Sequence, residues 1–346
     1  MEINILNDQE AATLRELIAA SSHIVICGHK SPDGDAIGSS LGWQYYLESL
    51  GKDVHVIVPD PYPDFLHWLP NIQTVIRYDK FGDRASELLH EADLVCCLDF
   101  NTTSRVENME QTLLSSPGKF ILVDHHPVPD FDKASLIVSH PEASSTSELV
   151  FRLIWQLGGF DQLNDKWAQC IYCGMMTDTG GFTYNSTDPS IYFIISQLLT
   201  KHIDKDKIYR NVFNNYSSWA LRLRGYIISQ KLNVFDDLHA TYYAVSRYEL
   251  EEFHFIKGDL EGLVNEPLRI RGAKLSISLR QDTEKDNLVW VSLRSVDDFP
   301  CNQLAGEYFN GGGHFNASGG RFNGTLDEAI ATTRKAIQAY AELLKK

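Results

Sequence analysis

The chain has 346 residues, 43% of them hydrophobic and 11% aromatic, which is enough for two globular domains and excludes an intrinsically disordered protein. Acidic residues outnumber basic ones by 46 to 31, for a net charge of −15, which argues against binding of long nucleic acid through its backbone and favours a small anionic substrate. No stretch reaches the roughly 20 apolar residues of a membrane helix, and the N-terminus lacks a secretory signal pattern, so we expect a cytoplasmic protein.

The N-terminal half is predicted to alternate short apolar strands with helices. This alternation is typical of a parallel sheet that is covered by helices on both faces. In such sheets, ligands bind outside the carboxyl ends of the strands. The expected strands are residues 23–28, 54–59, 93–99, 119–124 and 136–139, and the expected helices are residues 8–20, 37–50, 84–92 and 147–157.

The first expected strand leads into a turn with three potential metal ligands, His29, Asp33 and Asp35. The turn contains Pro32 and Gly34, so the three side chains can diverge from one loop. Imidazole and carboxylate ligands without a thiolate suit Mn²⁺ or Mg²⁺ better than a structural zinc site. Each aspartate alone would more often be a helix cap.

Three further segments end on the same kinds of side chain. Because the carboxyl ends of parallel strands meet at one edge of a sheet, the sequence predicts a single metal-dependent hydrolytic site at that edge. The segments, all interpreted as strand ends, are Cys97-Leu98-Asp99, the tripeptide Asp124-His125-His126, and Met176-Thr177-Asp178-Thr179-Gly180.

The six cysteines do not indicate a disulfide framework. Cys27, Cys96 and Cys97 lie inside predicted buried strands, where a free cysteine behaves as a small hydrophobic residue. Cys170 and Cys173 form an isolated C-x-x-C in a helical context, which we interpret as structural rather than as a zinc or redox site.

The C-terminal part has a different pattern and is predicted to be a smaller α+β domain. Alternating apolar residues predict strands at 240–246, 273–279 and 288–293, and residues 326–344 are predicted to be a terminal helix. Residues 188–224 are helical in pattern, without the composition of a flexible tether. We therefore expect domains at 1–190 and 226–346, joined by a helical linker at 191–225.

A run of three glycines precedes His314 in this second domain. Glycines allow backbone amides to approach an anion closely, although such a run is also compatible with a simple tight turn. His314 and the guanidinium of Arg294, whose fork geometry suits a phosphate, favour anion binding.

Taken together, these motifs resemble those of the DHH phosphoesterase superfamily. The resemblance rests on His29-x-x-x-Asp33-x-Asp35, Asp99, Asp124-His125-His126 and Thr177-Asp178-Thr179-Gly180. In the second domain, Gly311-Gly312-Gly313-His314-x-x-Ala317-Ser318-Gly319 and Ser292-Leu293-Arg294-Ser295 resemble the DHH-associated C-terminal domain. The match covers nearly the whole chain.

The resemblance implies a two-metal site with Mn²⁺, or Mg²⁺ as the alternative, in a cleft between the domains. Asp99 would bridge the two ions, and a hydroxide between them would attack the phosphorus. Asp124 would orient His125, and His126 would contact the scissile phosphate or donate a proton. One ion would be held by His29 and Asp33 and the other by Asp35, His125 and Asp178, while Arg294, Gly312, Gly313 and His314 would bind the substrate.

The resemblance is strongest to the standalone oligoribonuclease and pAp-phosphatase branch. It implies hydrolysis of short RNA to mononucleotides and of 3′-phosphoadenosine 5′-phosphate to AMP. A cyclic or linear dinucleotide phosphodiesterase is the alternative, because the same pocket would accept those substrates. A catalytically inactive nucleotide-binding regulator would lack a ligand, and none of the six is missing. We expect no membrane and no long duplex nucleic acid as partners, and leave a homodimer open.

Overall fold

The computed structural model describes residues 3–346, which form two compact units. The division falls between Asn215 and Tyr216. Among the described residues, none of the helices is both long enough and apolar enough to cross a membrane.

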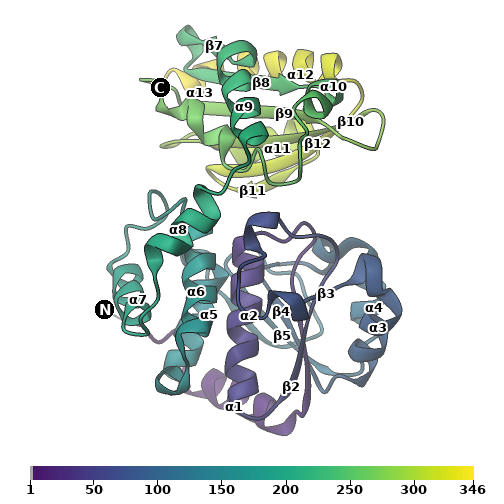
Figure 1. The fold of residues 1–346 in the computed structure, drawn as a ribbon, viewed down its shortest axis with the longest axis vertical. Helices are drawn as coiled ribbons and strands as arrows, with labels where there is room; N and C mark the ends of the chain where they lie inside the picture. Colours follow the sequence, from purple (N-terminus) through teal and green to yellow (C-terminus); the bar gives the residue numbers. More distant parts are fainter. Residues whose placement is uncertain (1–2) are drawn as a thin grey trace. The chain divides into compact units, whose positions relative to one another are not determined.

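The first unit is built on a parallel sheet, as the sequence predicted, although it has six strands and the short strand at Ile76–Arg77 was not expected (Figure 1). The strand order is β3-β2-β1-β4-β5-β6, so the chain leaves β1 toward one edge of the sheet and returns through β4 to build the other. Such a reversal is where ligands bind in open α/β sheets. The strands are β1 (His23–Cys27), β2 (Asp53–Val58), β3 (Ile76–Arg77), β4 (Leu94–Leu98), β5 (Lys119–Asp124) and β6 (Ala134–Ser139).

Helices cover both faces of this sheet, because successive strand residues point to opposite faces. In β1, Ile24 and Ile26 pack into one buried layer, and Val25 and Cys27 pack into the other. The first layer contains α1 (Asp8–Ala20), α2 (Gly34–Ser49), α5 (Thr146–Gln156) and α6 (Asp165–Asp178), and the second contains α3 (Tyr78–Glu91) and α4 (Glu110–Ser115). All six cysteines are buried and free.

Helices α2 and α6 cross closely because glycines line the contact. A Cβ atom on Gly38 would lie 2.6 Å from the carbonyl oxygen of Cys170, and one on Gly34 would lie 2.3 Å from Oγ1 of Thr177. A Cβ on Gly174 would lie 3.0 Å from Oδ1 of Asp35. The glycines thus bring the first turn of α2 against the last turns of α6.

The helices expected to form a linker are divided between the two units. Helices α7 (Pro189–Leu199) and α8 (Lys205–Phe213) lie in the first unit, where Ile194 and Ile208 join its main core. Helix α9 (Ser218–Tyr226) lies in the second unit, and its Leu223 is buried there in the same hydrophobic cluster as Tyr243.

The second unit is an α+β structure, as predicted. Its sheet has the order β11-β12-β10-β9-β8-β7, with β8 and β9 parallel and the other neighbours antiparallel. The strands are β7 (Asn233–Phe235), β8 (Ala240–Val245), β9 (Leu275–Gln281), β10 (Leu288–Ser295), β11 (Gly312–His314) and β12 (Ala317–Asn323). The helices after α9 are α10 (Arg247–Glu252), α11 (Cys301–Phe309), α12 (Leu326–Ala339) and α13 (Ala341–Leu344), so the predicted terminal helix is split at Tyr340.

The glycine run lies largely in an edge strand rather than in a tight turn. Gly312 pairs with Gly319 and Gly313 with Ser318 across β11 and β12. A Cβ on Gly311 would lie 2.0 Å from the carbonyl oxygen of Gly319. Glycine is therefore needed because the two backbone segments approach each other closely.

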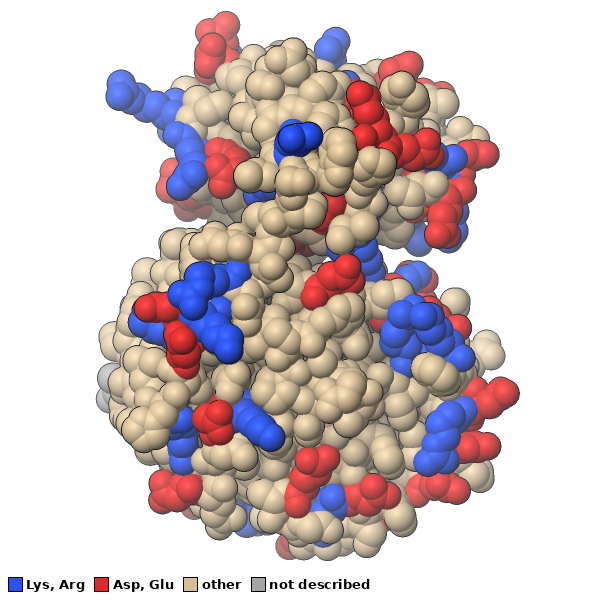
Figure 2. Space-filling model, in the orientation of Figure 1, with Lys and Arg blue, Asp and Glu red and all other residues tan. Residues whose placement is uncertain are grey.

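Charged side chains are interspersed on the face drawn in Figure 2, where basic residues lie among acidic ones and large areas carry no charge. Proteins that hold long nucleic acid usually present a continuous basic surface. The described side chains on this face form no such surface.

Candidate metal centre

Three strands of the first sheet end on one buried cluster. Asp99 directly follows β4, His125 directly follows β5, and His29 lies two residues after β1. Nε2 of His29 is 3.4 Å from Oδ2 of Asp99, and Nε2 of His125 is 3.6 Å from Oδ1 of the same carboxylate. Asp99 therefore lies between two imidazoles with one oxygen toward each, as expected for a ligand shared by two ions.

The start of α2 supplies two more of the predicted ligands. Asp33 is the N-cap of α2, where its Oδ1 accepts hydrogen bonds from the backbone N–H groups of Asp35 and Ala36. The same oxygen is 4.0 Å from Nε2 of His29. Asp35 is buried in the first turn, with Oδ2 3.9 Å from Nε2 of His125. The first turn of α2 thus places one carboxylate near each of the two imidazoles that flank Asp99.

Asp178 is brought to the cluster by a helix and not by a strand. It is the last residue of α6, and its Oδ2 is 3.3 Å from Nε2 of His125. The expectation of a fourth strand end was wrong because packing of α6 against α2 keeps this segment helical. The hydroxyl groups of Thr177 and Thr179 donate to carbonyls of the preceding helical turn.

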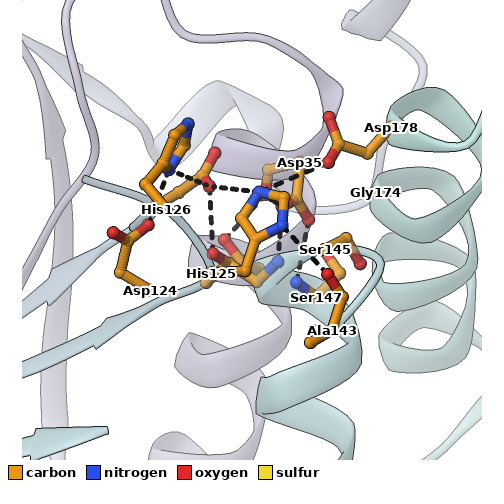
Figure 3. A network of polar contacts seen from close by, with 12 residues as sticks. Asp35, Asp124, His125, His126, Ala143, Ser145, Ser147, Gly174 and Asp178 are labelled. Carbon is orange, nitrogen blue, oxygen red and sulfur yellow. Dashed lines mark hydrogen bonds and ion pairs between the residues drawn. The ribbon is translucent and has the colours of Figure 1, made fainter. Parts of the chain in front are cut away.

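Asp124 contacts His126, whereas we expected it to orient His125. Oδ1 of Asp124 is 2.8 Å from Nδ1 of His126, and Nδ1 of His125 instead faces the carbonyl oxygen of Ala143 at 3.3 Å (Figure 3). The physical reason is that β5 ends at Asp124 and the chain bends at His126, so strand alternation no longer decides which imidazole meets the carboxylate. Asp124 remains a partner of an imidazole, but of the other histidine.

Both candidate histidine ligands have Nδ1 bound to a backbone carbonyl. His29 places Nδ1 2.7 Å from the carbonyl oxygen of Lys30, and His125 uses Ala143. Because a carbonyl only accepts, Nδ1 carries the proton and Nε2 is the nitrogen that can bind a metal. In both histidines Nε2 is the atom that faces the carboxylates.

The cluster concentrates negative charge in a buried place. Burial, reinforced by Asp35 and Asp33, raises the pKa of Asp99 well above its ordinary value. Burial likewise raises the pKa of Asp35. Although burial favours the neutral imidazole, Asp178 and Asp99 raise the pKa of His125 to about 9. Divalent cations would neutralise this charge and displace the proton.

The donor set fits such cations. The ligand atoms of His29, Asp33 and Asp99 all lie within 4.8 Å of one another, as do those of Asp35, Asp99 and His125. Within the described part of the chain, Oδ2 of the buried Asp124 has no hydrogen-bond partner. Carboxylate oxygens with imidazole nitrogens are the ligands of Mn²⁺ and Mg²⁺ sites.

Thr146 and Ser147, which sequence reasoning did not assign to the site, contact two of these carboxylates. The Thr146 hydroxyl donates to Asp99, and the backbone amides of both residues donate to Asp35. The available signal was Ser145-x-x-Glu148, which correctly marks the start of α5. A helix start supplies free N–H groups that attract carboxylates, but the sequence pattern alone does not indicate which carboxylates they meet.

The candidate substrate residues of the second unit lie on one face of its sheet. Arg294 in β10 and His314 in β11 both pair with Ala317 of the intervening strand β12. Residues at one level of adjacent strands point to the same face, so the two side chains emerge together. Within the described residues, Nε of Arg294 is buried without a hydrogen-bond partner.

Two family models match the chain, one in each unit. The DHH family N-terminal domain matches residues 23–175, and the DHHA1 domain matches residues 240–343. Among curated proteins, the bifunctional oligoribonuclease and PAP phosphatase NrnA of Thermus thermophilus is 30% identical, with 93% of this chain and 91% of the relative covered. The cyclic-di-AMP phosphodiesterase PdeA of Listeria monocytogenes is 28% identical over 94% of this chain, which spans only 49% of that relative.

Two solved structures are informative. An exopolyphosphatase-related protein from Bacteroides fragilis is 49% identical, with a TM-score of 0.94 and 99% of both chains covered. RecJ of Thermus thermophilus, solved in complex with Mn²⁺, is 15% identical with a TM-score of 0.56, covering 99% of this chain and 56% of RecJ. The RecJ likeness shows the fold alone.

Proposed function

Since the chain belongs to the DHH family and is therefore a hydrolase of phosphoester bonds, we propose that it releases mononucleotides from short oligoribonucleotides and converts 3′-phosphoadenosine 5′-phosphate to AMP. The observation that carries this proposal is the similarity to NrnA, which extends over both units and nearly the full length of both chains.

Two divalent cations, Mn²⁺ or alternatively Mg²⁺, are proposed to occupy the cluster. His29 and Asp33 would hold one, and Asp35, His125 and Asp178 the other, with Asp99 giving one oxygen to each. When bound, such a pair lowers the pKa of water and stabilises charge on the phosphate oxygens. The opposed directions of the two Asp99 oxygens support this assignment.

His126 is proposed to act on the substrate from beside the cluster. Asp124 accepts a hydrogen bond from Nδ1 of His126, which fixes the proton there and keeps Nε2 for the substrate. In its protonated form His126 would bind the scissile phosphate or give a proton to the leaving oxygen. Asp124 is thus assigned a positioning role.

Arg294 and His314 are proposed to bind the part of the substrate away from the scissile bond. Their shared sheet face supports joint recognition of one anionic group, since guanidinium and imidazole both donate hydrogen bonds to phosphate oxygens. Gly312 and Gly313, which directly precede His314, would allow close approach of the backbone.

The proposal is tested by supplying the purified protein and Mn²⁺ with 5′-labelled RNA of two to five nucleotides, with 3′-phosphoadenosine 5′-phosphate, and with single-stranded RNA of about 30 nucleotides. Rapid mononucleotide release from the shortest RNAs is the expected result. Equal rates on the long RNA, or no release from the short ones, would contradict the proposal. Asp99→Ala is the control: any activity that remains in a preparation of this variant is assigned to contaminating nucleases.

Two other substrates have specific support and belong in the same assay. The 49% identity to a protein described as exopolyphosphatase-related is the reason to include inorganic polyphosphate. The similarity to PdeA favours cyclic di-AMP, although this chain spans about half of that relative. Preference for either, measured as kcat/KM against the RNA dinucleotide, would replace the proposed substrate and leave the metal assignment intact.

A further inference from the structure

The first turn of α5 contacts two of the proposed ligands at once. The backbone N–H of Thr146 donates to Oδ2 of Asp35 at 2.6 Å, and that of Ser147 donates to Oδ1 at 2.8 Å. The hydroxyl of Thr146 donates to Oδ1 of Asp99 at 2.9 Å. Figure 3 shows Ser147 and Asp35 facing each other beside His125. The turn therefore joins carboxylates that come from α2 and from the end of β4.

This turn is buried and is held in place by hydrogen bonds of its own residues. Ser144 to Ser147 are at most 1% exposed. The side chain of Ser145 accepts from the N–H of Glu148, whose carboxylate in turn accepts from the backbone and hydroxyl of Ser144. Glu148 also forms a buried ion pair with Arg152 at 2.7 Å. The residues on either side of Thr146 are thus held by contacts that do not involve the proposed metal ligands.

The hydroxyl of Thr146 contacts one particular oxygen of the Asp99 carboxylate. With Oδ1 hydrogen-bonded to Thr146, this oxygen stays near His125, and Oδ2 is directed toward His29. Each oxygen keeps a lone pair, since a carboxylate oxygen accepts more than one contact. Asp99 also adopts a left-handed backbone conformation with φ of 66°, which the surrounding contacts must maintain.

We propose that Thr146 is a positioning residue of the metal centre, whose hydroxyl orients Asp99 so that its two oxygens reach two different cations. The inference rests on the proposed two-metal function. If the Thr146 hydroxyl only supplied a hydrogen bond to a buried carboxylate, removing it would change the stability of the fold. The affinity for the second ion and the coupling between the two ions would then stay the same. A positioning role instead predicts a change in how the second ion binds.

The test compares Thr146→Val, which removes the hydroxyl at nearly constant shape, with Thr146→Ser, which keeps it. Mn²⁺ binding is measured by calorimetry and by electron paramagnetic resonance, which distinguishes a coupled pair of ions from isolated ones. Wild type and Thr146→Ser should bind two coupled ions. In Thr146→Val the second ion should bind about 10- to 100-fold more weakly, the usual effect of losing a residue that orients a ligand, and coupling should be lost.

A matched control is Thr333→Val, another fully buried threonine, whose hydroxyl donates to Ala329 in the second unit. It should leave Mn²⁺ binding unchanged. Thermal melts in EDTA report folding, and Thr146→Ala replaces the valine variant under the same criteria if the latter is unfolded. Unchanged second-ion affinity and coupling without the hydroxyl would overturn the inference. A wild-type protein that binds fewer than two ions would overturn the proposed function itself, and this inference with it.

Discussion

Asp99 is the residue on which both halves of the proposed metal centre would depend, because each of its oxygens faces a different imidazole. Single residues elsewhere have narrower roles. Asp124 serves His126, and Thr146 contacts Asp99 and Asp35. These differences predict different kinetic effects for substitutions that look alike in the sequence.

Asp99→Ala should lower kcat by more than about 100-fold and abolish binding of a coupled ion pair, since a shared ligand is lost to both ions. The measurement is single-substrate kinetics on an RNA dinucleotide, together with Mn²⁺ titration. Near-normal turnover in this variant would contradict the two-metal assignment.

Arg294→Ala should mainly raise KM, since Arg294 is proposed to bind substrate in the ground state and the transition state alike. Mn²⁺ affinity should not change. Arg271→Ala, at an exposed arginine of the same unit, is the matched control. A fall in kcat at unchanged KM would assign Arg294 to the chemical step instead.

Glu249 should make stability pH-dependent in acid. Although partial burial opposes ionisation, hydrogen bonds from Lys231, Tyr226 and Ser246 lower the pKa of Glu249 to about 2. A pKa below the unfolded value means that the stabilisation is present above about pH 4.5 and is lost as the pH falls toward 2.

The stability difference between wild type and Glu249→Gln should therefore shrink between about pH 5 and 2, by at most about 3 kcal/mol. Denaturant unfolding at several pH values measures it. A difference that stays constant over this range would show that the carboxylate charge does not stabilise the fold.

At the scale of elements, the close crossing of α2 and α6 is what brings Asp35 and Asp178 to the same imidazole. The crossing exists because Gly34, Gly38 and Gly174 carry no side chain. Each carboxylate belongs to a different helix, so the distance between Asp35 and Asp178 depends on how closely α2 and α6 pack. The glycines allow that close packing.

Gly38→Ala should therefore destabilise the protein by about 1–3 kcal/mol, as overpacking does, and lower activity by moving the two helices apart. Gly225→Ala is the control, because a Cβ added to Gly225 in α9 would meet no atom within 4 Å, and this variant should gain up to about 1 kcal/mol. The measurement is chemical unfolding with activity assayed in parallel. Unchanged stability and activity in Gly38→Ala would show that the crossing adjusts without cost.

At the scale of the whole molecule, the two units have separate hydrophobic cores, and the predicted ligands all lie in the first. Burial raises the pKa values of Asp35 and Asp99 there, and although burial opposes it, the neighbouring Asp178 and Asp99 carboxylates raise the pKa of His125. Neutralising this charge should stabilise the first unit directly.

Mn²⁺ at 100 times its Kd should thus stabilise the protein by about 2.7 kcal/mol per site, and EDTA should remove this gain. Differential scanning calorimetry with and without the metal measures it. Asp99→Ala should show little response. If Mn²⁺ does not change the melting temperature of the wild type, this would argue against an ion in the cluster.

The sequence by itself determined the parallel sheet, most strand positions, and the meeting of His29, Asp99 and His125, because apolar periodicity and strand ends are local properties of the chain. It also identified Asp33 and Asp35 as residues of one turn. These features need no knowledge of how distant segments pack.

Only the tertiary structure decided the helical position of Asp178, the pairing of Asp124 with His126, the strand conformation of Gly312, and the contacts of Thr146. Each depends on a surface supplied by a distant segment: α2 against α6, β12 beside β11, and the start of α5 beneath two carboxylates. Local sequence preferences are weak compared with such packing, which is why the chain's pattern indicated the candidate ligands but not the groups that contact them.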